Sequence, residues 1–448
     1  MTRETKHFLS STATLVLPMA IQNLINTSVN AADVIMLGRA GKIALSAASL
    51  GSQVYFILSL IFFGLASGAS VLTAQYWGKR DTDAIEKILG FTMKFSFIVA
   101  FLFTAVVLAV PEAVMHIFSG EDEVIQSGAG YLRIIAFSYM ASAVTTAYLN
   151  LMRSIEKVII STVVYSVSLV INIVINAILI FGLLGFPAMG VRGAAIGTLI
   201  ARFSELAFVI IYAARFNKTI RIRAKYIFKT DSLLRKDFFT YSLPVVVNEL
   251  LWGTGISMLS SVIGHMGSSV TAANSVAQVV RQLAMVVLLG LANAAAIMIG
   301  KAIGAGKPEL AQNHASRFIK LTIILGVMSG LLILIVSPVV CAFMTLEPDS
   351  EEYLKQMLYI MSYFVIAQAI STVTIVGIFR SGGDTKVGLL LDVGSMWCIS
   401  LPLGAIAAFV LKLPVFAVYM ILCSDEIIKV PFCLWRYKSK KWLRNVTR

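Results

Sequence analysis

The chain has 448 residues, of which 58% are hydrophobic and only 13% are charged. A soluble domain carries roughly 25% charged residues, so this composition excludes an ordinary soluble protein. The apolar residues also form runs, such as 158–184 and 321–344, that are long enough to cross a bilayer as helices. The net charge of +14 falls mainly between these runs, which indicates membrane orientation and argues against a nucleic-acid partner.

Hydropathy predicts twelve membrane-spanning helices in chain order. They are expected at 15–37, 46–74, 88–110, 129–151, 158–184, 190–214, 238–263, 270–298, 318–344, 355–378, 387–410 and 414–435. Lys and Arg gather at both chain ends and in every second connection, whereas the acidic segments SGEDEV (119–124) and LEPDSEEY (346–353) fall in the other connections. Because cytoplasmic loops carry the excess of Lys and Arg, we predict that both termini are cytoplasmic.

The second half of the chain repeats the first at a shift of 226 residues. SLPVVVNELLWGTGISMLSSVIGHMG (242–267) falls on VLPMAIQNLINTSVNAADVIMLGRAG (16–41), so that Pro244 matches Pro18. A basic segment separates the halves, which predicts an N-terminal lobe (1–214), a cytoplasmic linker (215–237) and a C-terminal lobe (238–448). Six spans precede the linker, so both lobes enter the membrane from the same side. Two bundles related in this way usually enclose a cavity and rock against each other, which favours a transporter.

Several motifs, most of them present in both halves, resemble the multidrug and toxic compound extrusion (MATE) family over nearly the whole chain. They are LP at 17–18 and 243–244, DVIMLGRAG (33–41), GKRDTDA (78–84), NIVINAILIFG (172–182), GVRGAAIGT (190–198), GKAIGAGKPELA (300–311) and FRSGGDT (379–385). The resemblance implies an all-α polytopic membrane protein with twelve transmembrane helices in two six-helix bundles around a central cavity. It also implies export of organic, often cationic, compounds by alternating access in exchange for H⁺ or Na⁺.

The same resemblance sets the expected location and partners. We expect a multi-pass protein of the bacterial inner membrane that acts as a monomer. Its partners would be the lipid bilayer, small organic substrates and the coupling H⁺ or Na⁺, with no cofactor, no nucleic acid and no enzymatic activity. Two alternatives stay open: a flippase for lipid-linked oligosaccharides or related amphiphiles from the same superfamily, and a membrane enzyme or receptor. The second would need a constellation of catalytic or ligand-binding residues that the sequence does not show.

The first span carries a stripe of polar residues, NLINTSVNAADVIMLG (23–38). Asn23, Asn26, Asn30 and Asp33 are spaced three, four and three residues apart, which places them on one helix face. A carboxylate in the middle of a membrane helix costs roughly 2.5–3.5 kcal/mol and usually faces a cavity with a functional role. We therefore predict that Asp33 exchanges the coupling proton or binds Na⁺, with Asn26 and Asn30 beside it; the alternative is a structural acid bonded to neighbouring amides.

The fifth span adds two amides, Asn172 and Asn176, which lie one helical turn apart. Such residues usually form hydrogen bonds between helices. Members of the family often have Asn followed by Asp at this spacing, whereas the second position here is Asn176. A mechanism with two carboxylates in this lobe is therefore in doubt, but Asn176 can bind Na⁺ or form a hydrogen bond with Asp33.

Pro18 and Pro244 are predicted to act in conformational change. A proline removes a backbone hydrogen bond and makes a membrane helix easier to bend. The resemblance implies that bending of the first helix is linked to protonation. The alternative is that each proline simply marks the start of its helix, and their equivalent positions in the repeat slightly favour a structural role.

In the second lobe, Glu249 and Asp392 are the acids predicted to take part in cation coupling or substrate binding. One branch of the family has an acid eight residues after the proline of the seventh span and another on the tenth span. Here these two positions hold Trp252 and Ile370, so the second-lobe sodium site of that branch is not supported. Asp392 lies near the start of its helix, which leaves an interfacial position as the alternative.

Other charges inside the predicted spans are expected to pair along their own helix. Arg202 and Glu205 are separated by three residues, and Asp425 or Glu426 lies within one turn of Lys429. Such pairs offset the cost of removing a charge from water.

Arg281 differs because no acid lies one turn from it on the same span. Three interpretations are open for this residue. It can pair with Glu249, pair with Asp392, or meet an anionic group of another molecule.

Overall fold

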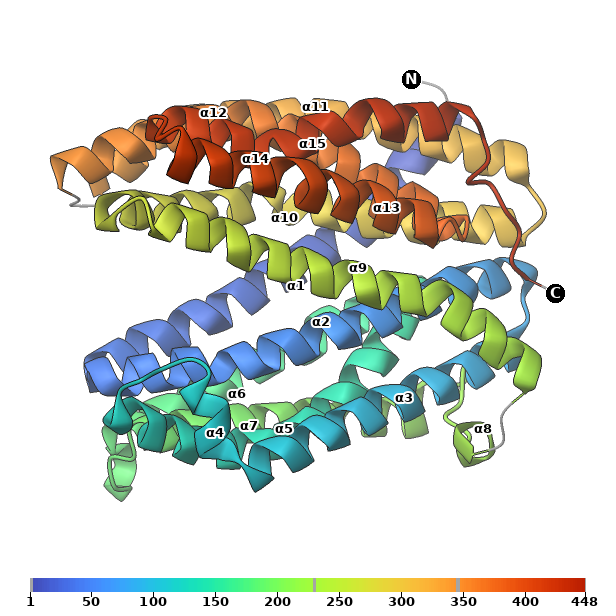
Figure 1. The fold of residues 1–448 in the computed structure, drawn as a ribbon. Coiled ribbons are helices and arrows are strands. Elements are labelled where there is room, and N and C mark those ends of the chain that lie inside the picture. Colours follow the sequence, from blue (N-terminus) through green and yellow to red (C-terminus); the bar gives the residue numbers. More distant parts are fainter. Residues whose placement is uncertain (1–2, 229–230, 344–346, 448) are drawn as a thin grey trace. The chain divides into compact units, whose positions relative to one another are not determined.

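The computed structural model describes residues 3–228, 231–343 and 347–447, and the regular structure within these ranges is helical (Figure 1). Seven helices have 28 to 38 residues, more than the roughly 20 that a single bilayer crossing requires, because polar residues extend them beyond the apolar runs. The α-helices are α1 (Arg3–Ala40), α2 (Lys42–Lys79), α3 (Thr82–Ala109), α4 (Pro111–His116), α5 (Asp122–Ser154), α6 (Ile159–Phe181), α7 (Val191–Ile211), α8 (Ala224–Phe228), α9 (Ser232–Gly264), α10 (Ser268–Gly304), α11 (Pro308–Phe343), α12 (Pro348–Thr372), α13 (Thr385–Ser395), α14 (Leu401–Ala405) and α15 (Val415–Lys438).

Each of the twelve predicted spans coincides with a helix, apart from the end of the ninth span at 344, which lies outside the described residues. Among the described residues, 11 helices are long and apolar enough to cross a membrane. The remaining predicted span falls on α15, which carries Asp425, Glu426 and Lys429 in its middle. Four short segments with π-helical geometry, 212–216, 373–379, 396–400 and 406–410, continue or interrupt the helices of the sixth, tenth and eleventh spans. The chain is thus an all-α polytopic membrane protein.

The chain packs as two compact units that do not follow its midpoint. Unit 1 comprises Met1–Ala20, Ala74–Arg80 and Leu243–Arg448, and unit 2 comprises Ile21–Thr73 and Asp81–Ser242. The predicted division into an N-terminal lobe (1–214), a linker (215–237) and a C-terminal lobe (238–448) stays a prediction. Three helices, α1, α2 and α9, pass from one unit to the other along their length.

Both repeated prolines lie inside their helices and beside these crossings. Pro18 is in the interior of α1, two residues before the chain leaves unit 1, and Pro244 is in the interior of α9, at the second residue of its unit 1 segment. Neither proline therefore marks the start of a helix. A proline in a helix interior removes one backbone hydrogen bond and is the usual cause of a kink, so each is placed where bending would reorient one unit's segment.

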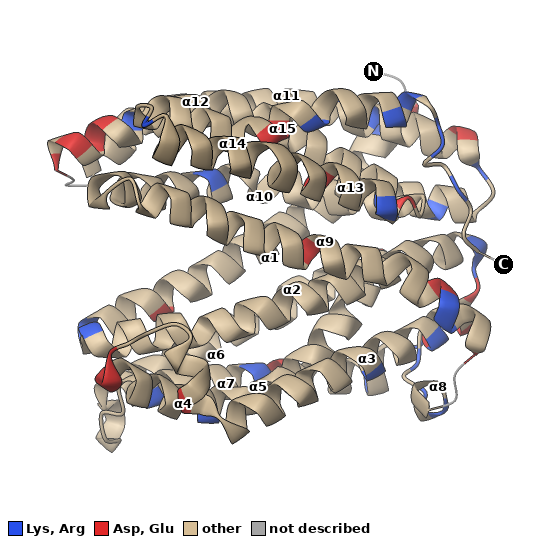
Figure 2. Cartoon of the chain, in the orientation of Figure 1, with Lys and Arg blue, Asp and Glu red and all other residues tan. Residues whose placement is uncertain are grey.

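Each unit has its own apolar core. In unit 2, α5 packs against α3 and α7, and the fully buried side chains include Leu58, Leu132 and Tyr139. In unit 1, α10, α11 and α12 pack on one another and α15 packs on α12 (Figure 1). Burial of apolar side chains supplies the packing, while charged residues gather toward the helix ends and only a few are placed along the helix middles (Figure 2).

Within unit 1, the end of α2 packs against the end of α10 through two glycines. A Cβ atom at Gly304 would collide with the backbone of Gln75, and one at Gly78 would collide with the backbone of Lys301. The 226-residue shift exchanges Gly78 with Gly304 and Gln75 with Lys301. The two close approaches are therefore a repeated pair, and they need glycine because any side chain would separate the two backbones.

The C-terminal segment holds the same end of α2. The side-chain amide of the buried Gln75 donates hydrogen bonds to the carbonyl oxygens of Ser381 (2.8 Å) and Arg444 (3.0 Å). Its side-chain oxygen accepts a hydrogen bond from the backbone N–H of Val446 at 2.8 Å. Gln75 thus ties the last residues of the chain to a helix from the first half.

The linker between the repeats is attached to α3 within unit 2. Glu86 on α3 accepts a hydrogen bond from the backbone N–H of Arg221 (2.8 Å) and pairs with the Arg223 guanidinium (2.7 Å). The Tyr226 hydroxyl on α8 donates to Asp83. Part of the basic segment is therefore fixed by carboxylates, and the rest of its charge is left at the surface.

Candidate functional site

Unit 2 contains a polar cavity of about 2020 Å³, including space open to solvent. Its walls come from α1, α2, α5, α6 and α7, so it lies wholly inside this unit. The stripe predicted on the first span faces it, because Asn26, Asn30 and Asp33 all line the cavity. Asn172 from α6 lines the same space. The polar face of α1 therefore meets a cavity, as its spacing predicts.

Asp33 is held by a chain of amides that runs from α6 to α7. The side-chain amide of Asn176 donates to Asp33 Oδ1 at 2.6 Å and to Asn172 Oδ1 at 3.3 Å. Asn172 in turn donates to Thr198 Oγ1 at 3.4 Å. Of the two interpretations left open for Asn176, the hydrogen bond to Asp33 is the one formed here.

The orientation of Asn176 depends on a glycine. Its Oδ1 atom is buried without a hydrogen-bond partner among the described residues and faces Gly197, where a Cβ atom would collide with it. Both amide protons are used, one on Asp33 and one on Asn172. Gly197 thus leaves room for an amide that presents hydrogen-bond donors, and not an oxygen, to the carboxylate.

Arg202, a cationic side chain that lines this cavity, already forms an ion pair. Arg202 Nη1 lies 2.9 Å from Glu205 Oε1 and 3.2 Å from Glu205 Oε2, so the predicted local pair forms. The Ser168 hydroxyl donates to the same carboxylate at 2.6 Å, and Arg202 also lies over the Tyr55 ring at 5.5 Å. Arg202 and Glu205 cancel each other's charge, and Asp33 remains as the one acid of the cavity with no ion pair among the described residues.

The two predicted acids of the second lobe are in unit 1 and are both paired. Glu249 Oε1 lies 2.7 Å from Arg380 Nη2, and Glu249 and Arg380 are 9% and 4% exposed, so the pair is buried. Asp392 Oδ1 lies 2.8 Å from Lys429 Nζ, and Asp392 Oδ2 accepts a hydrogen bond from Asn248 at 3.2 Å. Neither acid reaches Arg281. Both roles predicted for Glu249 and Asp392 stay predictions.

Lys429 gathers three carboxylates. Besides Asp392, its Nζ atom lies 3.3 Å from Asp425 Oδ2 and 3.1 Å from Glu426 Oε2, so the predicted pairs along α15 both form. Lys429 is only 2% exposed. Among the described residues, no group of three His, Cys, Asp or Glu side chains is arranged to hold a metal ion.

Several residues around Asp33 were not predicted as site residues. Thr198, Ser168 and the Arg202–Glu205 pair line the cavity, although sequence reasoning treated the pair as purely structural. Their spacing on α7, four and then three residues, places Thr198, Arg202 and Glu205 on one helix face, and this signal was available.

A helical membrane protein with a repeated sequence, two compact units and a polar cavity inside one of them has the architecture of a membrane transporter. The MatE family model matches residues 18–178 and 244–406, one segment in each half and together more than half of the chain. The chain therefore belongs to the MatE family.

Relatives and solved structures agree with this assignment. The chain is 23% identical over 433 residues to the "Probable multidrug resistance protein NorM" of Thermotoga maritima, covering 96% of this chain and 92% of that protein. It is also 23% identical to the "Probable multidrug resistance protein YoeA" of Bacillus subtilis, covering 92% and 89%.

Two solved structures share the fold. The structure described as an outward-facing conformation of a multidrug resistance MATE family transporter of the MOP superfamily matches with a TM-score of 0.86 at 20% identity, covering 96% of both chains. A MATE structure in the bent conformation matches with a TM-score of 0.87 at 20% identity, covering 97% of this chain and 96% of that one.

Proposed function

We propose that this protein exports organic compounds across the bacterial inner membrane by alternating access, coupled to the entry of a cation that binds at Asp33. The names of the relatives, multidrug resistance proteins, support export of organic compounds. The observation that carries the coupling is the charge balance of the unit 2 cavity. Asp33 has an amide partner and no ion pair among the described residues, because Arg202 is bound to Glu205.

A carboxylate in this position needs a positive partner for part of the transport cycle. An unpaired charge removed from water is expensive, and inside a membrane it is tolerated mainly where it binds an ion or exchanges a proton. A proton would neutralise Asp33 and leave its bond from Asn176 in place. Since Asn176 presents N–H groups to Asp33, the arrangement favours a proton over Na⁺, which binds oxygen atoms.

The fit of Na⁺ depends on the same amide. Oxygen atoms for the ion would come from Asp33 and from Asn176 after its side chain had turned over. Turning it would break both hydrogen bonds that its amide now donates. Proton coupling is therefore the first form of the proposal and Na⁺ coupling the second.

Efflux from proteoliposomes tests the coupling directly. The parent protein should export ethidium under an imposed pH gradient without sodium, and more weakly under a sodium gradient at constant pH. Asp33→Asn should abolish gradient-driven export, because an amide carries no exchangeable charge. It should retain exchange of labelled for unlabelled ethidium, which needs no coupling ion.

The matched control is Asp122→Asn, which makes the same chemical change at an exposed residue in the first turn of α5. Export by Asp33→Asn at the parent rate would refute the coupling role.

The alternative function, a flippase of lipid-linked oligosaccharides, predicts a different result. Expression of the protein would confer no tolerance to organic dyes, and deletion of its gene would produce a cell-envelope defect.

A further inference from the structure

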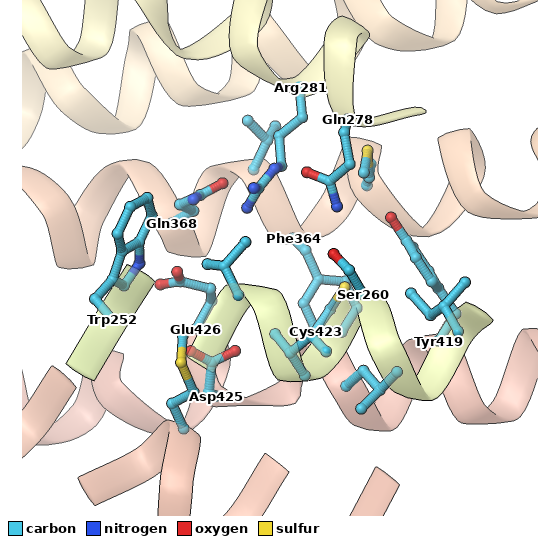
Figure 3. A pocket seen from close by; sticks show the side chains of 17 residues that line it. Trp252, Ser260, Gln278, Arg281, Phe364, Gln368, Tyr419, Cys423, Asp425 and Glu426 are labelled. Carbon is cyan, nitrogen blue, oxygen red and sulfur yellow. The ribbon is translucent and has the colours of Figure 1, made fainter. Parts of the chain in front are cut away.

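Unit 1 has a pocket of its own, with about 710 Å³ of space including some open to solvent (Figure 3). Its lining comes from α9, α10, α12 and α15 and from Met396, so it lies wholly within residues 243–448. Only about 60 Å³ of this space is accessible to the centre of a water-sized molecule. Sites for small molecules usually occupy roughly 300–1,000 Å³, so an organic molecule would fit only once the surrounding helices have moved apart. The pocket shares with such sites an apolar lining and a few placed polar groups, and these groups indicate which kind of molecule it would take.

One wall of the pocket carries Arg281, from the interior of α10. Its guanidinium points into the pocket (Figure 3) and makes no hydrogen bond or ion pair with any described residue. Two partners were open for it, and the structure assigns both elsewhere: Glu249 binds Arg380, and Asp392 binds Lys429. An arginine within a membrane helix is costly and is retained where it meets a partner. Of the three interpretations, an anionic group from another molecule remains.

The opposite wall carries negative charge. Figure 3 shows the carboxylates of Asp425 and Glu426 on the other side of the pocket from Arg281. Glu426 also accepts a hydrogen bond from Ser371 at 2.6 Å. Their one cationic partner, Lys429, is shared with Asp392, so three carboxylates surround a single ammonium group. This wall therefore has more negative than positive charge.

Aromatic and neutral polar groups complete the lining of the pocket. Trp252 and Phe364 offer rings to a flat apolar body, and Gln278 and Gln368 offer amides beside Arg281 (Figure 3). Tyr419 also lines the pocket and is 2% exposed, and its hydroxyl is bonded to the Cys423 thiol and to no nitrogen or oxygen of the described residues. A thiol is a weak hydrogen-bond partner, so a ligand oxygen or nitrogen at this position would give the hydroxyl a stronger hydrogen bond.

We propose that this pocket binds zwitterionic aromatic compounds, with the acidic group on Arg281 and the positive group facing Asp425 and Glu426. A compound that is only cationic would pair with the carboxylates of Asp425 and Glu426, but the Arg281 guanidinium would be left without an anionic partner. A compound that is only anionic would satisfy Arg281 but would face excess negative charge. The inference rests on the proposed export of organic compounds and adds a substrate class and a specificity-determining residue, Arg281.

A matched pair of dyes tests this preference. Rhodamine 110 carries a delocalised cation and a free carboxylate, and rhodamine 123 is its methyl ester, with the same cation and no carboxylate. Equilibrium binding to the purified full-length protein in lipid nanodiscs is measured by fluorescence polarisation. The parent protein should bind rhodamine 110 more tightly, because a bond between a guanidinium and a carboxylate is worth about tenfold or more in affinity.

Variants of Arg281 identify the residue responsible. Arg281→Gln should weaken binding of rhodamine 110 by about tenfold or more and should leave binding of rhodamine 123 unchanged or tighter, because its cation no longer meets an unpaired guanidinium. Retained binding of rhodamine 123 shows that the variant is folded. Arg281→Lys should fall between the two, since lysine keeps the charge but cannot form two parallel hydrogen bonds. Arg39→Gln, at the end of α1 and outside this pocket, should bind both dyes as the parent does.

Two outcomes would overturn the proposal: a parent protein that binds the ester as tightly as the acid, or an Arg281→Gln variant that weakens both dyes equally. The measurement needs no gradient, so it is independent of Asp33. If Asp33→Asn fails to abolish gradient-driven export while the dye preference persists, the coupling proposal is wrong and the pocket proposal stands. If the dye preference is missing while Asp33→Asn loses coupled export, the reverse holds.

Discussion

Arg202 and Asp33 line one cavity, yet the guanidinium is bound to Glu205. If Glu205 lost its charge, Arg202 would be free to pair with Asp33. A lasting ion pair would keep Asp33 ionised and prevent it from releasing and accepting a cation. Glu205 thus keeps Asp33 free to bind and release a cation, because it binds the Arg202 guanidinium that would otherwise pair with Asp33.

We therefore expect Glu205→Gln to abolish export driven by a pH gradient, although Glu205 itself is not the coupling acid. Export by the variant is measured in proteoliposomes beside Glu112→Gln, which removes an exposed pair with Arg133 and should leave export unchanged. A combined Glu205→Gln and Arg202→Gln variant should recover part of the export, because the competing cation is gone. No recovery in this double variant would contradict the explanation.

The Glu249–Arg380 pair makes a prediction about stability. Removing one partner of a buried ion pair costs about 3–5 kcal/mol, because the remaining charge stays out of water. Glu249→Gln should therefore lower the midpoint of thermal unfolding in detergent clearly. Glu351→Gln breaks a surface pair with Lys355 and should cost no more than about 1 kcal/mol, so the two midpoints should differ.

At the scale of the helix, Pro18 and Pro244 sit beside the points where α1 and α9 pass between units. Replacing either proline by alanine restores a backbone hydrogen bond, and a proline in a helix interior costs about 3 kcal/mol. We expect Pro18→Ala to raise the unfolding temperature and to slow export. The same result with Pro244→Ala would assign the effect to both crossings, whereas a stabilised variant that exports at the parent rate would exclude a role for bending.

The two glycines between α2 and α10 predict a local packing effect. In Gly304→Ala the new Cβ atom would meet the backbone of Gln75, which cannot move like the end of a side chain. Overpacking of this kind costs about 1–3 kcal/mol. Gly264→Ala is the matched control, since a Cβ atom there meets no other atom within 4 Å. Thermal unfolding of the two variants should separate them, and equal midpoints would show that α2 and α10 adjust without cost.

The positions of the helices were predictable because hydropathy reports apolar runs, but their lengths were not. α1 begins at Arg3, although its span was predicted from residue 15, because helical extensions outside the apolar run have no hydropathy signal. The polar face of α1 was predictable from its spacing. The bond from Asn176 to Asp33 could be named only as one of two alternatives, since it joins side chains from helices far apart in the sequence, α6 and α1.

Ion pairs along one helix were predictable, and pairs between helices were not. Arg202–Glu205 and the contacts of Lys429 with Asp425 and Glu426 follow from one-turn spacing. Glu249 and Arg380 are 131 residues apart, and no feature of the sequence records their contact. The partner of Arg281 could not be predicted for the same reason, because Glu249 and Asp392 bind Arg380 and Lys429 on other helices.

For the whole molecule, the repeat and the two units do not share their boundaries. Residues 1–20 and 74–80 come from the first repeat but belong to unit 1 with the second, and residues 232–242 precede the second repeat's proline but belong to unit 2. The hydrogen bonds of Gln75 and the glycine contacts between α2 and α10 hold residues 74–80 in unit 1. Each repeat therefore completes the unit built mainly by the other.

Because each unit contains segments from both repeats, the two halves of the chain should not fold separately. If the coding sequence is cut between codons 228 and 231, neither fragment holds a whole unit, so each expressed alone should be degraded in the cell. Expressed together from separate promoters, the fragments should restore dye tolerance. Tolerance and fragment abundance on immunoblots measure the effect, and a second fragment that accumulates stably by itself would contradict it. If the repeat arose by fusion of two copies of one gene, the fused halves could then no longer fold as separate proteins, because each unit contains a helix segment encoded by the other half.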